Sequence, residues 1–296
     1  MKNILKSAAF LVFLIFSPLL VEAEILRLPP VELLPVFTPS LTFLSGIEGW
    51  FNFLYYTDNA GDEYFSHDSE MGILFTLLST KEFSLQAFTR EIIQNQVNSI
   101  VESSLGFWLR ALITDLRLTA TLNAGLFYIQ AGFRHDCKHD IDRFLGRNAV
   151  HDVLFLNLLL KEIKLRWQVS AFFSSFKIGL LGEKNLPYIF QEVKPEPDKS
   201  QISLSAELAL IAHPRYGSLF VNGKVSGIRR KTTGTEVNHV IDPAVDWHIQ
   251  LGYRTPCIKK SAVLYYQIEY ITDPWVNNNL KPHLLKSIGF VISIKG

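Results

Sequence analysis

The chain has 296 residues, of which 48% are hydrophobic, 12% aromatic and 19% charged. This composition excludes a disordered chain, and the counts of 17 Gly, 13 Pro and 2 Cys exclude a collagen-like protein and a disulfide scaffold. Lys and Arg number 29 against 28 Asp and Glu, a formal net charge of +1, which argues against a basic nucleic-acid-binding protein.

Residues 1–23 have the three-part pattern of a secretory signal peptide. Lys2 and Lys6 form a positively charged start, and an almost unbroken apolar run follows. Val21 and Ala23 then provide residues suited to the two key positions of a cleavage site. The alternative is an N-terminal membrane anchor, for which the apolar run is short. We therefore expect an exported chain that begins after Ala23.

Residues 24–45 form a proline-rich segment with Pro29, Pro30, Pro35 and Pro39. Prolines favour extended backbone and are poorly tolerated inside a sheet. This segment is predicted to be an extended periplasmic lead-in or a partial plug of the structure that follows it.

From residue 46 onward, apolar and polar residues alternate with the period of two that is typical of β-strands. In residues 201–212, for example, Ile202 and Leu204 lie on one face and Gln201 and Ser203 on the other. Twelve such segments are predicted, in chain order 46–57, 69–79, 82–93, 108–122, 125–135, 151–162, 163–175, 201–213, 216–228, 240–254, 259–271 and 284–295.

The connections between these segments are sorted by length. Those after even-numbered segments are short, whereas most of those after odd-numbered segments are long and polar, up to the run 176–200. No stretch after the signal peptide reaches the roughly 18–20 apolar residues of a spanning helix. We therefore predict an all-β fold, a closed antiparallel up-and-down transmembrane β-barrel of about 12 strands over 46–296, in the bacterial outer membrane. A soluble exported β-protein is the alternative.

The two faces of the predicted barrel have different roles. The apolar face would meet lipid, and aromatic residues near strand ends would form interfacial girdles. These aromatics are Trp50, Tyr55, Tyr56, Tyr253, Tyr270 and Trp275. The inward face carries both signs of charge, which leaves open whether the lumen is plugged by paired charges or filled with water. Its charged residues include Arg90, Arg117, Arg166, Lys224, Glu207, Asp246 and Glu269.

The fifth segment runs into the sequence Gly-Phe-Arg-His-Asp-Cys-Lys-His-Asp-Ile-Asp at residues 132–142. His135 and Cys137 share one face of a strand because they are two residues apart, so the imidazole could activate the thiol as a nucleophile. Asp152 on the next segment has the same outward parity and could orient the imidazole. His139 and Asn148 are the alternatives for the supporting roles.

The His135-x-Cys137 pair at the top of the fifth of twelve strands resembles the His-x-Ser motif of outer-membrane phospholipase A and of the lipid A deacylase barrels. The longer pattern also resembles a His-x-Ser-x-His-x-Gly-Asp loop of uncharacterised outer-membrane barrels. This resemblance implies hydrolysis of lipid acyl esters at the outer rim. Cys137 stands where those families have Ser, and Lys138-His139 stands where the phospholipase has Asn-Gly.

Two other interpretations of this segment remain open. It could be a charged surface loop, or it could bind a metal through candidate ligands that also include His135. The main metal candidates are Asp136, His139, Asp140 and Asp142. The first long connection has acidic residues that could hold Ca²⁺, although they lack an EF-hand pattern. They are Asp58, Asp62, Glu63 and Asp68.

The two cysteines are predicted to lie at opposite ends of the barrel. Cys137 belongs to the outer end and Cys257 to a periplasmic turn. A strand of about ten residues separates the ends by about 25 Å, whereas a disulfide needs Cα atoms within about 7 Å. We therefore expect no disulfide between them.

Three functions are compatible with these sequence patterns. The leading hypothesis is a lipid acyl-ester hydrolase with Cys137, His135 and Asp152 as its catalytic residues and outer-membrane lipids as its partners. The alternatives are a channel or porin-like transport barrel and an adhesin or structural barrel that acts through its long loops. No nucleic-acid partner is expected, and the sequence does not determine the oligomeric state.

Overall fold

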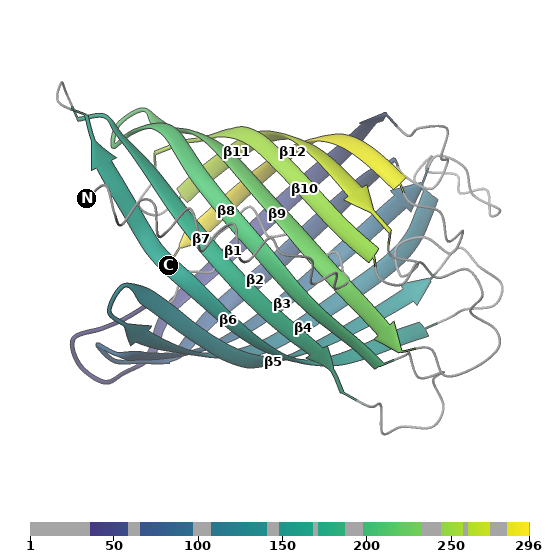
Figure 1. Ribbon diagram of the computed structural model, residues 1–296, viewed down its shortest axis with the longest axis horizontal. Helices are drawn as coiled ribbons and strands as arrows, with labels where there is room; N and C mark the ends of the chain where they lie inside the picture. The colour runs from purple at the N-terminus through teal and green to yellow at the C-terminus, as the bar shows by residue number, and fades with distance from the viewer. Residues whose placement is uncertain are drawn as a thin grey trace, which may run out of the picture.

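In the computed structural model, the chain forms a closed barrel of twelve β-strands (Figure 1). The structure describes residues 36–58, 66–96, 108–140, 148–167, 171–186, 198–231, 244–256, 260–272 and 283–295. The predicted signal peptide 1–23 and the first part of the proline-rich segment 24–45 lie outside these ranges and stay predictions.

The strands are β1 (Thr42–Asp58), β2 (His67–Ser79), β3 (Phe83–Gln96), β4 (Trp108–Ala124), β5 (Phe127–Asp140), β6 (Asn148–Arg166), β7 (Phe173–Asn185), β8 (Asp198–His213), β9 (Gly217–Lys231), β10 (Ala244–Arg254), β11 (Lys260–Ile271) and β12 (His283–Lys295). Every strand pairs antiparallel with its neighbours in the sequence, and β1 also pairs with β12. Closure removes the free edges that an open sheet would expose, so each strand has a hydrogen-bonding partner on both sides.

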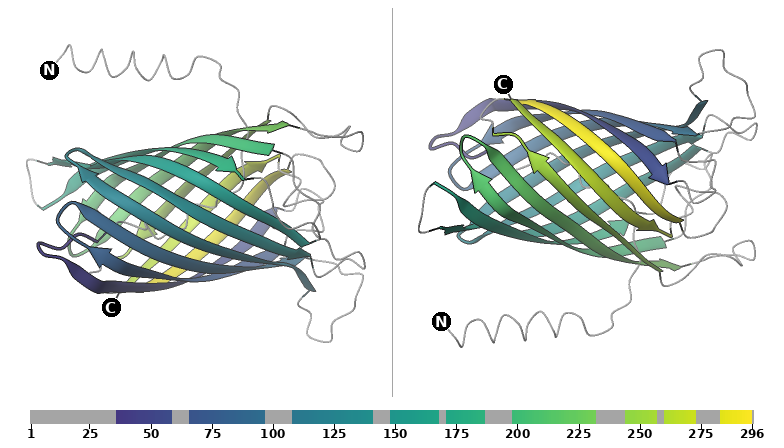
Figure 2. Two further views of the ribbon diagram at one scale, coloured as in Figure 1. Left: turned by 90° about the horizontal axis from the view of Figure 1, so that it is seen from below. Right: turned by 90° about the horizontal axis from the view of Figure 1, so that it is seen from above.

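Figure 2 shows the strands tilted strongly around the barrel axis, as closure requires. None of the described residues belongs to a helix that is long and apolar enough to span a membrane. The predicted all-β barrel is confirmed.

The two rims of the barrel carry connections of different length. At one rim, tight hairpins of two to six residues join the strands, and at the other rim the connections are seven to twelve residues long. The hairpins lie at the left end of the barrel in Figure 1. In the β4–β5 hairpin, Gly125 has a φ of 69°, a left-handed conformation that glycine adopts without strain. Following the pattern of bacterial barrels, we refer to the hairpin end as the periplasmic rim and the other end as the extracellular rim.

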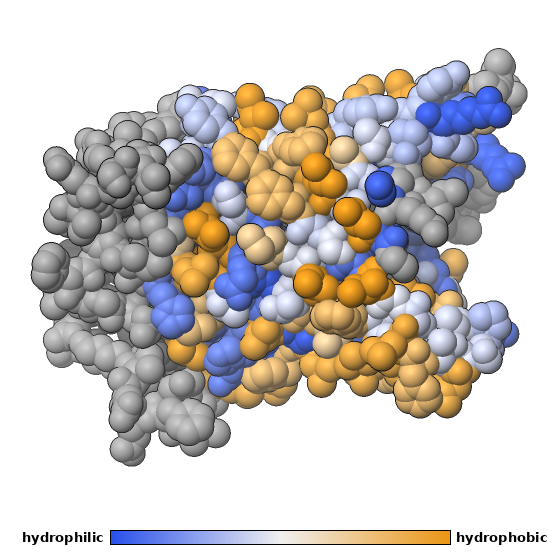
Figure 3. Space-filling view, turned by 180° about the vertical axis from the view of Figure 1, so that it is seen from behind, coloured by the Kyte–Doolittle hydropathy of each residue, from blue (hydrophilic) through white to orange (hydrophobic). Residues whose placement is uncertain are grey.

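Exposure alternates along the strands as the sequence predicts. In β6, Leu154, Leu156 and Leu158 point outward with 50%, 59% and 40% of their surface exposed, whereas Val153 is fully buried. Figure 3 shows apolar side chains, mixed with some polar ones, over much of the barrel wall. An apolar outer wall on a closed sheet is the surface that acyl chains can solvate.

The lumen is more aromatic than the sequence predicts. Trp50 and Tyr56 were expected in the outer girdles but lie inside the barrel, with 5% and 2% of their surface exposed. The Trp50 ring lies over Gly72 of the paired strand, where an added Cβ would come within 2.2 Å of it. Tyr265 covers Gly289 in the same way. Small residues opposite large rings therefore let aromatic side chains fill this part of the lumen.

Other aromatic residues agree with the predicted girdles. Tyr55 and Tyr253 point outward with 54% and 40% of their surface exposed, near the extracellular end of β1 and the periplasmic end of β10. Trp275 lies outside the described residues. Both rims thus carry an outward-facing tyrosine at the level where interfacial rings are typical.

Buried ion pairs occupy the extracellular half of the lumen. Arg90 contacts Asp115 at 2.7 Å, and Arg134 contacts Glu183 at 2.5 Å. All four side chains have at most 5% of their surface exposed. This arrangement agrees with the predicted inward charges of both signs.

One predicted strand was placed wrongly. The sequence pattern predicts a seventh strand over 163–175, but β6 continues to Arg166 and β7 begins at Phe173. Of the predicted long connection 176–200, residues 176–185 therefore belong to β7 and residues 198–200 to β8. A register irregularity between Leu160 and Ile163 shifts the alternation of apolar and polar residues inside β6. The alternation after this shift resembles that of a separate strand, but residues 163–166 still belong to β6. Arg166, which that pattern assigned to the inward face, is exposed at the end of β6.

Candidate functional site

The extracellular end of β5 presents two different faces. Arg134, Asp136 and Lys138 point into the lumen and are buried. His135 and Cys137 alternate with them on the outer face and are half-buried. The period of two that the sequence shows therefore places the imidazole and the thiol on the outer wall of the barrel.

His135 contacts Asp152 on the neighbouring strand. The two residues are direct cross-strand partners between β5 and β6, and Nδ1 of His135 lies 2.8 Å from Oδ1 of Asp152. The two side chains are 37% and 26% exposed, so the pair is accessible from outside the barrel. This contact fixes the direction of the imidazole ring.

The thiol of Cys137 contacts the second imidazole of the segment. Its Sγ atom lies 3.1 Å from Nε2 of His139, two residues further along β5. Cys137 itself pairs with Thr114 of β4 and Val150 of β6. Asn148, the alternative orienting residue from the sequence, is the cross-strand partner of His139, and its side chain lies outside the described part of the structure.

The structure therefore brings His135 to Asp152 and Cys137 to His139. Both imidazoles lie two residues from the cysteine on the same face, one in each direction along the strand. The thiol contacts His139, and a different χ1 rotamer of Cys137 would be needed to turn it towards His135. A thiol in contact with an imidazole can lose its proton to that ring, which is the chemical requirement for a cysteine nucleophile.

The metal-binding candidates do not converge on one point. Asp136 faces the lumen and binds Arg134 at 2.6 Å, whereas His139 is on the outer face. The side chain of Asp140 and the whole of Asp142 lie outside the described residues. No group of three or more potential metal ligands occurs among the residues that the structure describes.

The acidic residues considered for Ca²⁺ lie around the first long connection. Asp68 is buried and accepts a hydrogen bond from Tyr56 at 3.1 Å. Asp62 and Glu63 lie outside the described residues, as does the side chain of Asp58. Ca²⁺ binding at this connection stays a prediction.

Cys137 is a free thiol. It lies near the extracellular end of β5, whereas the connection that contains Cys257 joins β10 to β11 at the periplasmic rim. Cys257 itself lies outside the described residues. The absence of a disulfide between the two stays a prediction.

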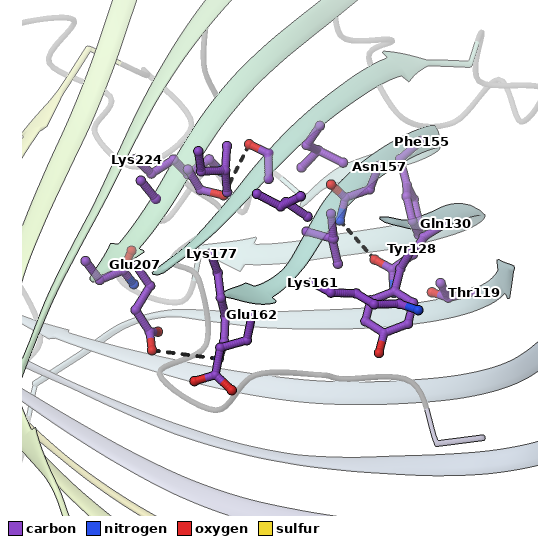
Figure 4. Close-up of a pocket in the computed structure, with 18 of the residues that line it drawn as sticks. Thr119, Tyr128, Gln130, Phe155, Asn157, Lys161, Glu162, Lys177, Glu207 and Lys224 are labelled. Atoms are coloured by element: carbon purple, nitrogen blue, oxygen red, sulfur yellow. Dashed lines mark hydrogen bonds and ion pairs between the residues drawn. The ribbon is translucent and has the colours of Figure 1, made fainter. Parts of the chain in front are cut away.

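A second candidate site is a cavity of about 400 Å³ in the periplasmic half of the lumen (Figure 4). Its wall includes Tyr128, Lys161 and Arg254, all near the hairpin ends of their strands. The charged residues Glu207 and Lys224, for which the sequence predicts an inward direction, also belong to this wall. The sequence does not predict the cavity itself, because its volume depends on side chains from β2 to β10.

Comparison with solved structures defines the class of protein to which this fold belongs. LpxR from Salmonella typhimurium has a TM-score of 0.51 and 9% identity, over 83% of this chain and 99% of that one. The NanC porin has a TM-score of 0.44 and 9% identity, over 84% and 98% of the two chains. Outer membrane phospholipase A from Escherichia coli has a TM-score of 0.42 and 11% identity, over 87% and 98%.

The chain is thus similar to outer-membrane β-barrels and has their fold. At these identities the likeness extends to the architecture alone. The sequence matches no protein-family model, and no curated protein is significantly similar to it. Its function must therefore be argued from its own side chains.

Proposed function

We propose that this chain is an integral outer-membrane barrel that hydrolyses acyl esters of membrane lipids at its extracellular rim. The observation that carries the proposal is the outward-facing thiol of Cys137, 3.1 Å from His139 and beside the hydrogen-bonded His135–Asp152 pair. These polar groups lie on the outer wall of the barrel beside a further polar pair, Thr114 and Glu91, and the ester groups of outer-leaflet lipids would reach them there. Two imidazoles, a thiol and a carboxylate are the components of a cysteine hydrolase.

The reaction would proceed in two steps. An imidazole accepts the thiol proton, the sulfur forms a bond to the ester carbonyl carbon, and the lipid alkoxide leaves with that proton as an alcohol. The acyl group is then a thioester on Cys137. In the second step the imidazole takes a proton from water, the hydroxide attacks the thioester, and the carboxylic acid and the free thiol are released.

His139 is the base that the observed geometry favours, because its Nε2 already contacts the thiol. His135 is the alternative base, since Asp152 holds its ring through Nδ1 and leaves Nε2 directed elsewhere. In that arrangement Asp152 has the orienting role of the third member of a triad.

The test is lipid hydrolysis by purified protein. We expect the wild type to release fatty acid from phospholipid or lipid A in vesicles, assayed both with Ca²⁺ and with a chelator. Cys137→Ala should lower the rate by about 10³-fold or more, because the nucleophile is lost. Cys257→Ala is the matched control, since it removes the other thiol of the chain, and it should leave the rate unchanged. Intact lipids after incubation with the wild type, or an active Cys137→Ala variant, would refute the proposal.

A second comparison identifies the base. If His139 accepts the proton, His139→Ala should lower the rate by about 10²- to 10⁴-fold, whereas His135→Ala should have a smaller effect. The reverse order, together with a loss in Asp152→Ala, would assign the role to His135. The covalent thioester should be detectable by mass spectrometry as an acyl adduct on Cys137.

A further inference from the structure

The periplasmic half of the lumen contains a cavity of about 400 Å³, which the proposed hydrolase chemistry does not use. Protein interiors are normally packed to near crystal density, and few voids exceed the size of a water molecule. Pockets that bind small molecules have volumes of about 300–1,000 Å³. The size of this cavity therefore falls in the range of a ligand site.

The charged residues of the cavity wall are mostly positive. The wall has five cationic residues, Arg117, Lys161, Lys177, Lys224 and Arg254, and three acidic residues, Glu162, Glu183 and Glu207. Glu207 contacts both Lys177 at 3.9 Å and Arg254 at 3.2 Å, so one carboxylate serves two cations. The wall as a whole favours an anion.

Lys161 is the cationic residue of the cavity wall that is best placed to bind an anion. It donates a hydrogen bond to Asn123, and its ammonium lies 4.8 Å from the centroid of the Tyr128 ring (Figure 4). Both partners are uncharged. Among the residues that the structure describes, Lys161 has no acidic side chain within ion-pair distance. Its charge is thus held in position without being neutralised.

The remaining wall suits an apolar body. Phe88, Tyr128, Phe155 and Phe220 contribute aromatic rings to it. At the end of the cavity farther from the hairpins lies Glu183, whose Oε2 atom is buried and has no hydrogen-bond partner. An anion would therefore lie with its charge near Lys161 and its apolar part deeper in the lumen.

We propose that this cavity binds a small organic anion with an apolar, ring-sized body, which enters from the periplasmic rim and places its charged group at Lys161. The alternative occupant is water alone, since polar cavities of this size have room for ordered water. The proposal is independent of the hydrolase assignment. The cysteine site is on the outer wall near the extracellular rim, whereas the cavity is inside the lumen near the periplasmic rim.

The test is binding of naphthalene-2-carboxylate to the full mature protein in a neutral detergent, measured by titration calorimetry. Lys161→Gln should weaken binding by roughly tenfold, the order expected for the loss of one charge-assisted hydrogen bond. Lys295→Gln is the matched control at the same rim. Lys295 is 50% exposed and pairs with Glu48, and both residues lie outside the cavity wall, so binding should not change.

A second variant and a second ligand distinguish binding in this cavity from partition of the ligand into the detergent. Thr119→Trp would fill the cavity from the wall and should abolish saturable binding, while an unchanged heat-dependent mobility on a gel would confirm that the barrel folds. The neutral analogue 2-naphthalenemethanol should not distinguish the wild type from Lys161→Gln. Equal affinity of the wild type and Lys161→Gln for the carboxylate, or saturable binding that survives Thr119→Trp, would overturn the proposal.

Discussion

Arg134 illustrates how single residues hold the lumen of this barrel together. Its side chain is 1% exposed and contacts Asp136 at 2.6 Å and Glu183 at 2.5 Å. The two acidic side chains are themselves only 11% and 4% exposed. One guanidinium thus compensates two carboxylates that water can barely reach, and a buried charge without a partner is very costly.

We predict that Arg134→Ala lowers the free energy of unfolding by about 3–5 kcal/mol, the usual cost of removing one partner from a buried ion pair. Urea unfolding of the protein refolded into lipid vesicles measures this change. Lys164→Ala, which breaks the exposed pair with Glu162, is the control and should cost at most about 1 kcal/mol. Equal effects of the two substitutions would show that the Arg134 contacts do not stabilise the barrel.

Residue types and parity predict much of the candidate site, but not its contacts. The period of two places His135, Cys137 and Asp152 on one face of adjacent strands, and the strand pairing brings His135 to Asp152. The rotamer of Cys137 decides which imidazole the thiol meets, and a sequence pattern contains no information about that rotamer. The inward direction of Trp50 has a different cause, because it shares the parity of Glu48 and Asn52 in β1, and residue type alone assigned this aromatic side chain to the wrong face.

At the scale of a single element, β6 spans the barrel wall from rim to rim. It has 19 residues, and Leu158 lies near its middle with 40% of its surface exposed. Leu165 lies on the same strand near the periplasmic rim and is 60% exposed. If the wall is surrounded by lipid, the cost of a charge on it must depend on depth.

Leu158→Arg is therefore expected to lower the free energy of unfolding in vesicles by about 2–4 kcal/mol, because the guanidinium would lie near the bilayer midplane. Leu165→Arg provides the control within the same strand. Its longer side chain can reach the interface, so its cost should be about 0–1 kcal/mol. Similar costs at both positions would argue that the wall does not face hydrocarbon.

The predicted positions of most strands are close to those in the structure, and the exception has a physical cause. Residues 158–160 are three consecutive leucines without a turn-forming residue, and the register irregularity that follows them inverts the alternation. The turn between β6 and β7 is closed instead by a hydrogen bond from the Trp167 amide to the Phe172 carbonyl, 3.1 Å long. Neither residue is a typical turn former, so local composition could not locate this turn.

Phe37 and Thr38, which precede β1, contact other strands at the periplasmic rim. Phe37 stacks on Tyr128 with ring centroids 5.5 Å apart, although the two residues are distant in the sequence. The Thr38 amide donates a hydrogen bond to the Thr80 carbonyl in the β2–β3 hairpin. Both contacts lie at the periplasmic rim, next to the cavity that Tyr128 helps to line. They hold residues 37 and 38 at this rim, while the prediction that segment 24–45 is an extended lead-in or a partial plug stays a prediction, because residues 24–35 lie outside the described part of the chain.

At the scale of the whole molecule, the contents of the lumen decide between a channel and a closed barrel. The extracellular half of the lumen contains buried ion pairs. The interior of the barrel also contains a cluster of buried apolar side chains that includes Trp50, Phe88 and Tyr265. Gln250 donates a hydrogen bond to Gln267 at 2.6 Å, so these two buried amides also occupy part of the interior. A porin lumen instead stays wide enough for water and solutes.

We therefore predict that the protein forms no steady conducting pore. In planar bilayers between about −100 and +100 mV it should show no discrete current steps in potassium chloride, because buried ion pairs and aromatic side chains occupy the lumen of the described barrel. A general porin reconstituted in the same way is the positive control, and heat-modified mobility of the sample shows that the barrel has folded. Reproducible steps from the wild type that scale with salt concentration would instead favour transport through the lumen, and the cavity at the periplasmic rim would then be the entrance of a channel.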